Sequence, residues 1–267
     1  MKIGLALSGG AVKGMAHIGV IKYLEERKIN VSHVAGTSAG SLIGAFYAAG
    51  LSAEEMEQIA LEINWKEIIR NITRVRFPRK GLINTEFLSR IVEKFLGQIT
   101  FEDLEKPFIA VSVDIEKSNI VHTEQGDLTS ALMASCAIPG ILTPVERNGL
   151  SLVDGGVLQN IPTRPLVDKG LKEIIAVDLN AHSDLTGVPE SIFEIIFRSI
   201  YMMARERDDQ DSKLAKHYIA PDLGKIGAWE LDKTKELIEL GYQEAKNVLG
   251  QAQFKPGLWG RIAGRRK

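Results

Sequence analysis

The sequence of 267 residues has little of what marks several classes of protein. Its single cysteine, Cys136, has no partner for an internal disulfide, which suits a reducing compartment, so we expect a cytoplasmic protein. The 33 basic and 34 acidic residues almost cancel, and this balance gives no reason to expect nucleic acid as a partner. No apolar run approaches the ~20 residues that span a bilayer, and the N-terminal run is too short for a signal peptide. We therefore expect a soluble protein, or one that at most rests on the inner face of a membrane.

What the sequence does contain is an alternation of short apolar runs, rich in Val and Ile, with longer helix-like stretches. We predict strands at residues 3–7, 31–35, 108–115, 150–153, 174–179 and 217–220. We predict helices at about residues 14–27, 39–49, 53–69, 85–96, 127–136, 163–170, 190–213 and 230–250. This order predicts a three-layer α/β/α fold with a mainly parallel central sheet. Because no Pro/Gly/Ser-rich linker divides the chain, we expect one domain over residues 1–255, followed by a basic tail at 256–267 that frays.

Residues 36–40, Gly-Thr-Ser-Ala-Gly, form a G-x-S-x-G motif between a predicted strand and a predicted helix. In this setting we expect Ser38 on a sharp strand-to-helix turn, where Gly36 and Gly40 allow tight backbone geometry. The positive end of the helix would then stabilise a serine alkoxide. The alternative is that these glycines only pack the helix closely on the strand, because the short motif alone is weak.

A second glycine-rich turn, Ser-Gly-Gly-Ala-Val-Lys-Gly at residues 8–14, follows the first predicted strand and opens the first helix. Backbone N–H groups at such a turn bind anions, and the anion of acyl transfer is the oxygen of the tetrahedral intermediate. A phosphate-binding P-loop fits less well, because Met15 and Ala16 stand where its Lys and Ser/Thr would be. A dinucleotide fingerprint would need glycine in place of Ala11. Lys13 is either a solvated charge or a cation that holds the loop and attracts an anionic head group, and we favour a structural and electrostatic role.

A serine nucleophile needs a proton acceptor, and Asp154 is the strongest candidate. It ends the apolar run 150–153 and precedes Gly155 and Gly156, so we expect its carboxylate at the C-terminal edge of the parallel sheet, free to approach the serine. The simpler interpretation is an ordinary Asp-Gly turn. Because an aspartate with a pKa of about 3.9 is a poor base, we expect desolvation to raise its pKa. A histidine triad stays open through His182 or His217, although neither stands in a recognisable catalytic context.

The glycine-rich turn at residues 8–14, the G-x-S-x-G motif at 36–40 and Asp-Gly-Gly at 154–156 follow one another along the chain. In this order they resemble the motifs of the patatin-like phospholipases, specifically the short bacterial type. The resemblance implies that Gly9, Gly10 and Ala11 line an oxyanion hole, that Ser38 attacks, and that Asp154 acts as base. The motif is supported by Lys13, Gly14, Gly36, Gly40, Gly155 and Gly156. The proline-containing segment 134–140 also resembles a family segment, and the likeness runs from residue 1 to about residue 178. The family usually has a third glycine and an arginine where this chain has Ala11 and Lys13. Ala11 keeps its backbone N–H, whereas a lysine lacks the guanidinium fork.

The resemblance implies a lipid acyl ester as substrate, in a phospholipid, a lysophospholipid or a simpler lipid. Two basic stretches, 70–80 and 261–267, would suit peripheral contact with an anionic membrane, or they are solvated loops. Nothing in the sequence indicates a metal or another cofactor. An acidic run on one predicted helix, Asp208, Asp209 and Asp211, is expected to face solvent rather than to bind calcium.

Three functions follow, and the leading one is a lipid acyl hydrolase with a Ser38–Asp154 dyad. The second is an acyl thioesterase or general carboxylesterase with the same dyad. The third, from another class, is a non-catalytic regulatory or adaptor protein on the same fold. The sequence does not indicate which head group, acyl-chain length or ester position the protein prefers. It does not indicate the oligomeric state either.

Overall fold

A computed structural model describes residues 2–63, 85–183, 188–189, 192–224, 226, 230–252 and 254. The basic segment 70–80, the end of the predicted helix 53–69 and the predicted tail 256–267 lie outside these residues. The predicted division into one domain and a tail stays a prediction. Among the described residues, no helix is both long and apolar enough to cross a membrane.

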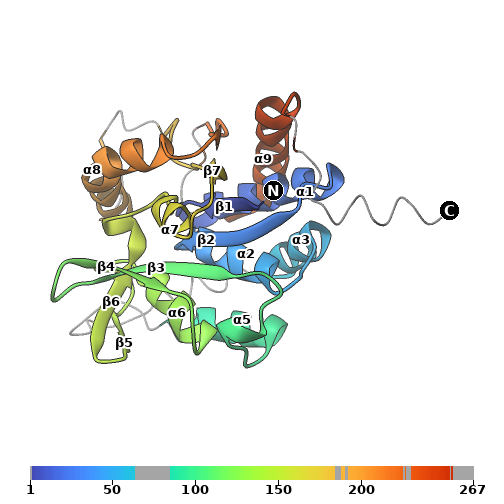
Figure 1. Ribbon diagram of the computed structural model, residues 1–267. Helices are drawn as coiled ribbons and strands as arrows, with labels where there is room; N and C mark the ends of the chain where they lie inside the picture. Colours follow the sequence, from blue (N-terminus) through green and yellow to red (C-terminus); the bar gives the residue numbers. More distant parts are fainter. Residues whose placement is uncertain are drawn as a thin grey trace.

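A mainly parallel sheet forms the centre of the molecule (Figure 1). Its parallel strands lie in the order β3-β2-β1-β7-β8. Their bounds are β1 (Ile3–Leu7), β2 (Val31–Thr37), β3 (Phe108–Asp114), β7 (Glu173–Val177) and β8 (His217–Ile219). Three antiparallel strands extend the sheet beyond β3, namely β4 (Asn119–Thr123), β5 (Val145–Arg147) and β6 (Leu150–Asp154).

Helices cover both faces of the sheet, as the alternation of elements predicts. The described α-helices are α1 (Met15–Glu26), α2 (Ala39–Ala48), α3 (Ala53–Glu62), α5 (Glu86–Leu96), α6 (Leu128–Ser135), α7 (Arg164–Asp168), α8 (Ile192–Ser212) and α9 (Thr234–Leu249). Short 3₁₀ turns stand at η1 (Ala11–Gly14), η2 (Phe101–Asp103), η3 (Gly155–Val157) and η4 (Leu231–Lys233). The three-layer α/β/α architecture is therefore confirmed.

Alternate residues of the inner strands build two cores of different character. Leu5 and its partners across the sheet, Val34 and Ile175, are large and belong to the main cluster, to which α1, α2, α3, α5, α6 and α9 contribute. The next row carries small side chains, Ala6 and Ala35 among them, and these lie in a second cluster with residues of α7. Burial on both faces explains why these strands are continuous apolar runs in the sequence.

The antiparallel edge differs from what the sequence predicts. Asp154 lies at the expected edge, because it pairs with Ser112 while Thr37, at the C-terminal end of the parallel strand β2, pairs with Val111. The strand that carries it, β6, nevertheless runs antiparallel to β3, so a parallel direction for this strand was the wrong expectation. β4 and β5 were not predicted, because β4 is partly exposed and β5 is only three residues long.

Two strands that carry candidate site residues meet end to end on one edge of β3. β4 pairs with β3 along residues 110–114, so β2 and β6 share the opposite edge. Thr37 at the end of β2 lies opposite Val111, and Asp154 at the end of β6 lies opposite the next residue, Ser112. The residue after β2 and the last residue of β6 are thereby brought together.

Candidate active site

Ser38 occupies the sharp turn between β2 and α2 that the motif predicts. Its backbone has φ 53° and ψ −124°, a combination that costs a non-glycine residue about 1–3 kcal/mol. The flanking glycines make the turn possible by close packing: a Cβ on Gly36 would lie 2.4 Å from the carbonyl oxygen of Gly40, and one on Gly40 would lie 2.2 Å from that of Leu7. The glycines therefore pack the helix on the sheet and also form the sharp turn, whereas the role of Ser38 as nucleophile stays a prediction.

A buried hydrogen-bond relay fixes this turn from the side of α6. The N–H of Ser38 donates to the hydroxyl of Ser135 at 2.9 Å, and that hydroxyl donates to the carbonyl of Val111 at 2.6 Å. The carbonyl of Ser38 accepts from the hydroxyl of Ser41 at 2.7 Å. Ser135 belongs to the segment 134–140 that the sequence singled out, although its serine was given no role there.

Asp154 lies beside Ser38 and is almost fully buried, with 4% of its surface exposed. One carboxylate oxygen accepts the N–H of Gly156 at 2.8 Å, and the side chain of Ser38 is near enough to lower the pKa of the carboxyl. Burial raises the pKa of Asp154 from 3.8 to about 6, against the opposing effects of the Ser38 side chain and of the bond from Gly156. The expected effect of desolvation is confirmed, and a carboxyl of this pKa is ionised in most molecules at neutral pH.

The five histidines lie elsewhere, since within the described residues none has a hydrogen bond or ion pair with Ser38 or Asp154. His17 is fully buried in α1, and its Nε2 donates to the carbonyl of Ser8 at 2.8 Å. Burial lowers the pKa of His17 to about 4, so its ring is neutral, as expected of a core residue. Nε2 of His217 lies 3.8 Å from a carboxylate oxygen of Glu173, on the outer strand β8. The histidine triad that the sequence left open thus finds no support in the contacts of the site.

The glycine turn after β1 lies against Ser38. A Cβ on Gly9 would lie 3.1 Å from the Cβ of Ser38 and 2.6 Å from Oδ1 of Asn160. The N–H of Gly9 donates to Oδ1 of Asn160 at 3.0 Å. The N–H groups of Gly10 and Ala11 have no hydrogen-bond partner in the described part of the chain. Of the three residues expected at an oxyanion hole, two therefore have an amide without a partner among the described residues.

Asn160 belongs to a polar network that connects the glycine turn with α8. The backbone N–H groups of Asn160 and Ile161 donate to Oδ1 of Asp208 at 3.0 and 3.2 Å. Asp211, one turn further on, accepts from Nε2 of Gln159 at 2.8 Å. Burial raises the pKa of Asp208 to about 7, an effect partly offset by the bond from Ile161.

The network contradicts the expectation that the acidic run on this helix faces solvent. Asp208 and Asp211 are 6% and 2% exposed, and Asp209 alone of the three is exposed. The signal that could have found them is their helical phase, because Ala204, Asp208 and Asp211 follow one another at spacings of four and three residues on the buried face of α8. No group of three or more His, Cys, Asp or Glu among the described residues could hold a metal ion.

Lys13 is not the solvated charge that was one of its two interpretations. It is buried, and its Nζ donates to the hydroxyl of Ser183 at 3.2 Å. Burial lowers the pKa of Lys13, and the nearby charge of Asp178 opposes that shift. The favoured structural and electrostatic role therefore agrees with its surroundings.

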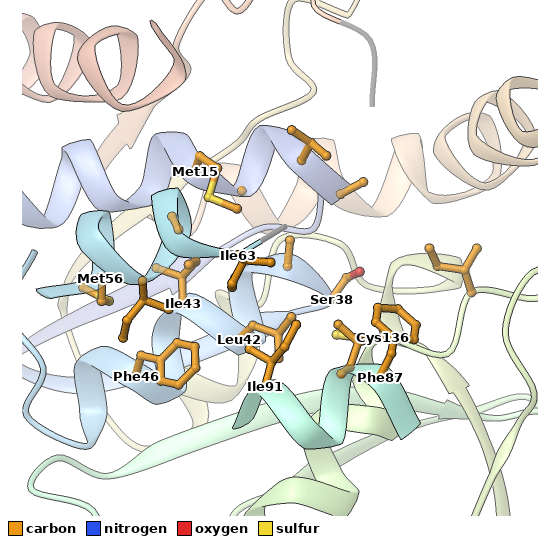
Figure 2. A pocket seen from close by; sticks show the side chains of 18 of the residues that line it. Met15, Ser38, Leu42, Ile43, Phe46, Met56, Ile63, Phe87, Ile91 and Cys136 are labelled. Carbon is orange, nitrogen blue, oxygen red and sulfur yellow. The ribbon is translucent and has the colours of Figure 1, made fainter. Parts of the chain in front are cut away.

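An apolar cavity of about 160 Å³ begins at Ser38 and extends between α2, α3 and α5 (Figure 2). Ser38 stands at one end of the labelled side chains, and Phe46 and Met56 stand at the other. Among the lining residues that the structure describes, Ser38 has the only hydroxyl and Cys136 the only thiol. Burial raises the pKa of the Cys136 thiol, which is therefore neutral. The residues come from five separate parts of the chain, so no local pattern in the sequence predicts this cavity.

Comparison with known proteins extends the likeness beyond these motifs. A family model described as patatin-like phospholipase matches residues 5–167, which include both Ser38 and Asp154. A protein of Mycobacterium tuberculosis described as an NTE family protein is 34% identical over 179 residues, covering 67% of this chain and 49% of that protein. Human patatin-like phospholipase domain-containing protein 6 is 29% identical over 280 residues, covering 93% of this chain and 20% of that protein. The chain thus spans half or less of the length of these relatives.

Solved structures share the fold at much lower identity. VipD from Legionella pneumophila aligns with a TM-score of 0.58 and 15% identity, covering 93% of this chain and 66% of that chain. A chain of the ExoU–SpcU complex from Pseudomonas aeruginosa aligns with a TM-score of 0.55 and 16% identity, covering 94% of this chain and 51% of that chain. The family model matches more than half of the residues, and the mycobacterial relative is 34% identical over 67% of the chain, so the chain belongs to the patatin-like phospholipase family.

Proposed function

We propose that this protein cleaves the acyl ester bond of a lipid, with Ser38 as nucleophile and Asp154 as general base. The family supports a lipid acyl hydrolase, and the roles of the two residues are inferred from their surroundings. One observation carries the proposal: Ser38 lies between the buried carboxyl of Asp154 and an apolar cavity. A hydroxyl next to a base of raised pKa can attack, and the cavity offers an apolar chain a place beside it.

In the first half of the reaction, Oγ of Ser38 attacks the carbonyl carbon of the ester while its proton passes to the carboxylate of Asp154. The tetrahedral intermediate then collapses, the ester C–O bond breaks, and the leaving alcohol takes the proton from Asp154. In the second half, Asp154 accepts a proton from water as the water attacks the acyl-serine. Cleavage of that second ester releases the fatty acid and returns the proton to Ser38.

The glycine turn supplies the proposed oxyanion hole. Because the amide of Gly9 is already engaged by Asn160, we assign the binding of the oxyanion to the amides of Gly10 and Ala11. Each well-placed donor stabilises such a transition state by about 3–4 kcal/mol. Gly9 then has a different part, since its bond to Asn160 holds the turn in place.

This anchor predicts an effect of Asn160 on turnover. Asn160→Ala removes the acceptor of a buried N–H, and we expect kcat/KM for a simple ester to fall about tenfold to a hundredfold. Asn160→Asp keeps an acceptor at the same place and should retain more activity than Asn160→Ala. Circular dichroism and the thermal midpoint of each variant separate a local effect from unfolding. Equal rates for the alanine variant and the original protein would contradict the role given to this bond.

The proposed function is tested by turnover of a substrate panel. We expect Ser38-dependent release of fatty acid from phosphatidylcholine or lysophosphatidylcholine, offered in octanoyl and palmitoyl forms, with the Ser38→Ala variant as blank. Turnover confined to acyl-CoA thioesters or to simple p-nitrophenyl esters would favour the thioesterase or carboxylesterase alternative. A protein that turns over no member of the panel and does not react with a fluorophosphonate would favour the non-catalytic alternative.

A further inference from the structure

The cavity next to Ser38 is small, at about 160 Å³. We propose that it holds about six to ten carbons of the acyl group, with Phe46 and Met56 forming its closed end. This inference rests on the proposed function, because it assigns the cavity to the acyl part of the substrate. It names the substrate class as esters of medium-chain fatty acids.

The upper limit of ten carbons comes from the spacing of residues on α2. Ser38, Leu42 and Phe46 all line the cavity, and they follow one another at intervals of four residues on one side of the helix. Eight residues of α-helix rise about 12 Å. An extended chain advances about 1.2 Å per bond, the value for a peptide backbone, so about ten carbons fit between the serine and the ring of Phe46.

The lower limit of six carbons comes from the volume of the cavity. The cavity measures about 160 Å³, and a dry apolar protein cavity of ~150 Å³ is known to hold benzene, which has six carbons. Both limits, six and ten carbons, are well below the number of carbons in palmitic acid. A longer acyl group would therefore have to leave its end outside the cavity or displace side chains.

The far end is closed because its residues lie in the core. Phe46 and Met56 are 6% and 2% exposed, and Ala60, one turn after Met56 on α3, is 4% exposed. Figure 2 shows the side chains of Phe46 and Met56 grouped at the end away from Ser38, with Leu42 and Ile43 between the two ends. The position of Met56 makes it the residue whose removal would lengthen the cavity.

The chain-length limit predicts a maximum in a series of p-nitrophenyl esters from butanoate to hexadecanoate. We expect kcat/KM to rise roughly fourfold per methylene up to octanoate or decanoate and to fall for dodecanoate and hexadecanoate. Met56→Ala should move the maximum toward longer chains by about two carbons. Met133→Ala is the matched control, since Met133 is also buried, at 4% exposed against 2% for Met56, but does not line the cavity. Ile43→Phe should move the maximum toward shorter chains.

A binding measurement separates this inference from the proposed function. The sodium salts of the same fatty acids are titrated by calorimetry, and affinity should peak at the same length, with the same shift in Met56→Ala. A peak in binding without any ester turnover would retain the cavity assignment and reject the proposed function. Ester turnover and binding that rise without a break to hexadecanoate, or a maximum that none of the cavity variants moves, would overturn the length limit.

Discussion

We expect the replacement of Ser38 by alanine to abolish labelling by a fluorophosphonate probe and to lower ester turnover about 10⁴-fold or more. The reason is that the variant removes the oxygen that forms the covalent bond, and loss of a serine nucleophile has effects of this size in other hydrolases. The overall structure should persist, because alanine fits the space of serine and the backbone turn is held by Ser135 and by the close packing of Gly36 and Gly40.

The matched control for this variant is Ser112→Ala. Ser112 is 2% exposed and lies opposite Asp154 in the sheet, yet its hydroxyl has no hydrogen-bond partner among the described residues. We expect its loss to change turnover by about twofold at most, because an unpaired hydroxyl contributes no bond. If the probe still labelled Ser38→Ala at an unchanged rate, another residue would be the nucleophile.

The Asp154→Asn variant should lose activity and gain stability at once. Asparagine keeps the shape and can accept the N–H of Gly156, but it is no base, so we expect turnover to fall about 10³- to 10⁴-fold. Because the folded pKa of about 6 lies above the ordinary 3.8, the folded protein holds this proton longer than the unfolded chain does. Stability is therefore lost as pH rises from about 4 through 6, by roughly 3 kcal/mol at most. The variant has no carboxylate to bury and escapes this loss.

Thermal unfolding at two pH values measures the gain in stability of the Asp154→Asn variant. The midpoint of Asp154→Asn should exceed that of the original protein by about 5 °C at pH ~8, and the difference should vanish near pH ~4. Asp209→Asn, an exposed aspartate on α8, is the control and should change neither the midpoint nor the turnover. Full activity of Asp154→Asn, together with loss of activity in a His182 or His217 variant, would establish a histidine triad instead of the dyad.

The sequence predicted those parts of the fold that depend on burial and on local backbone geometry. The inner strands are apolar on both faces, and the turn at Ser38 requires small neighbours, so both leave a direct trace in the residues. The direction of β6 leaves no such trace, because an apolar run reads alike in parallel and antiparallel strands. Its partner strand β5 is too short for a period to show.

The polar parts of the site were harder to predict, for a different physical reason. The residue types of Lys13 and Asp208 favour solvent, and only tertiary contacts decide that a lysine bonds to Ser183 or that an aspartate binds two backbone amides. Asn160 has no glycine or strand end next to it to draw notice, although its side chain lies against the glycine turn. The cavity was beyond the sequence altogether, since it exists only where several helices meet.

The end-to-end meeting of β2 and β6 has a consequence for how this protein tolerates insertions. The pairing of β2 and β6 with β3 sets the distance between Ser38 and Asp154. Thr37, the residue before Ser38, pairs with Val111, and Asp154 pairs with the next residue of β3, Ser112. Extra residues in the turn of the β5–β6 hairpin leave the pairing of Asp154 with Ser112 unchanged, because that pairing is at the opposite end of β6 from the turn. A single residue added within β3 shifts one partner by about 3.3 Å and turns its side chain to the other face. The chain can thus vary the length of its outer hairpin freely, whereas the length of one inner strand is fixed.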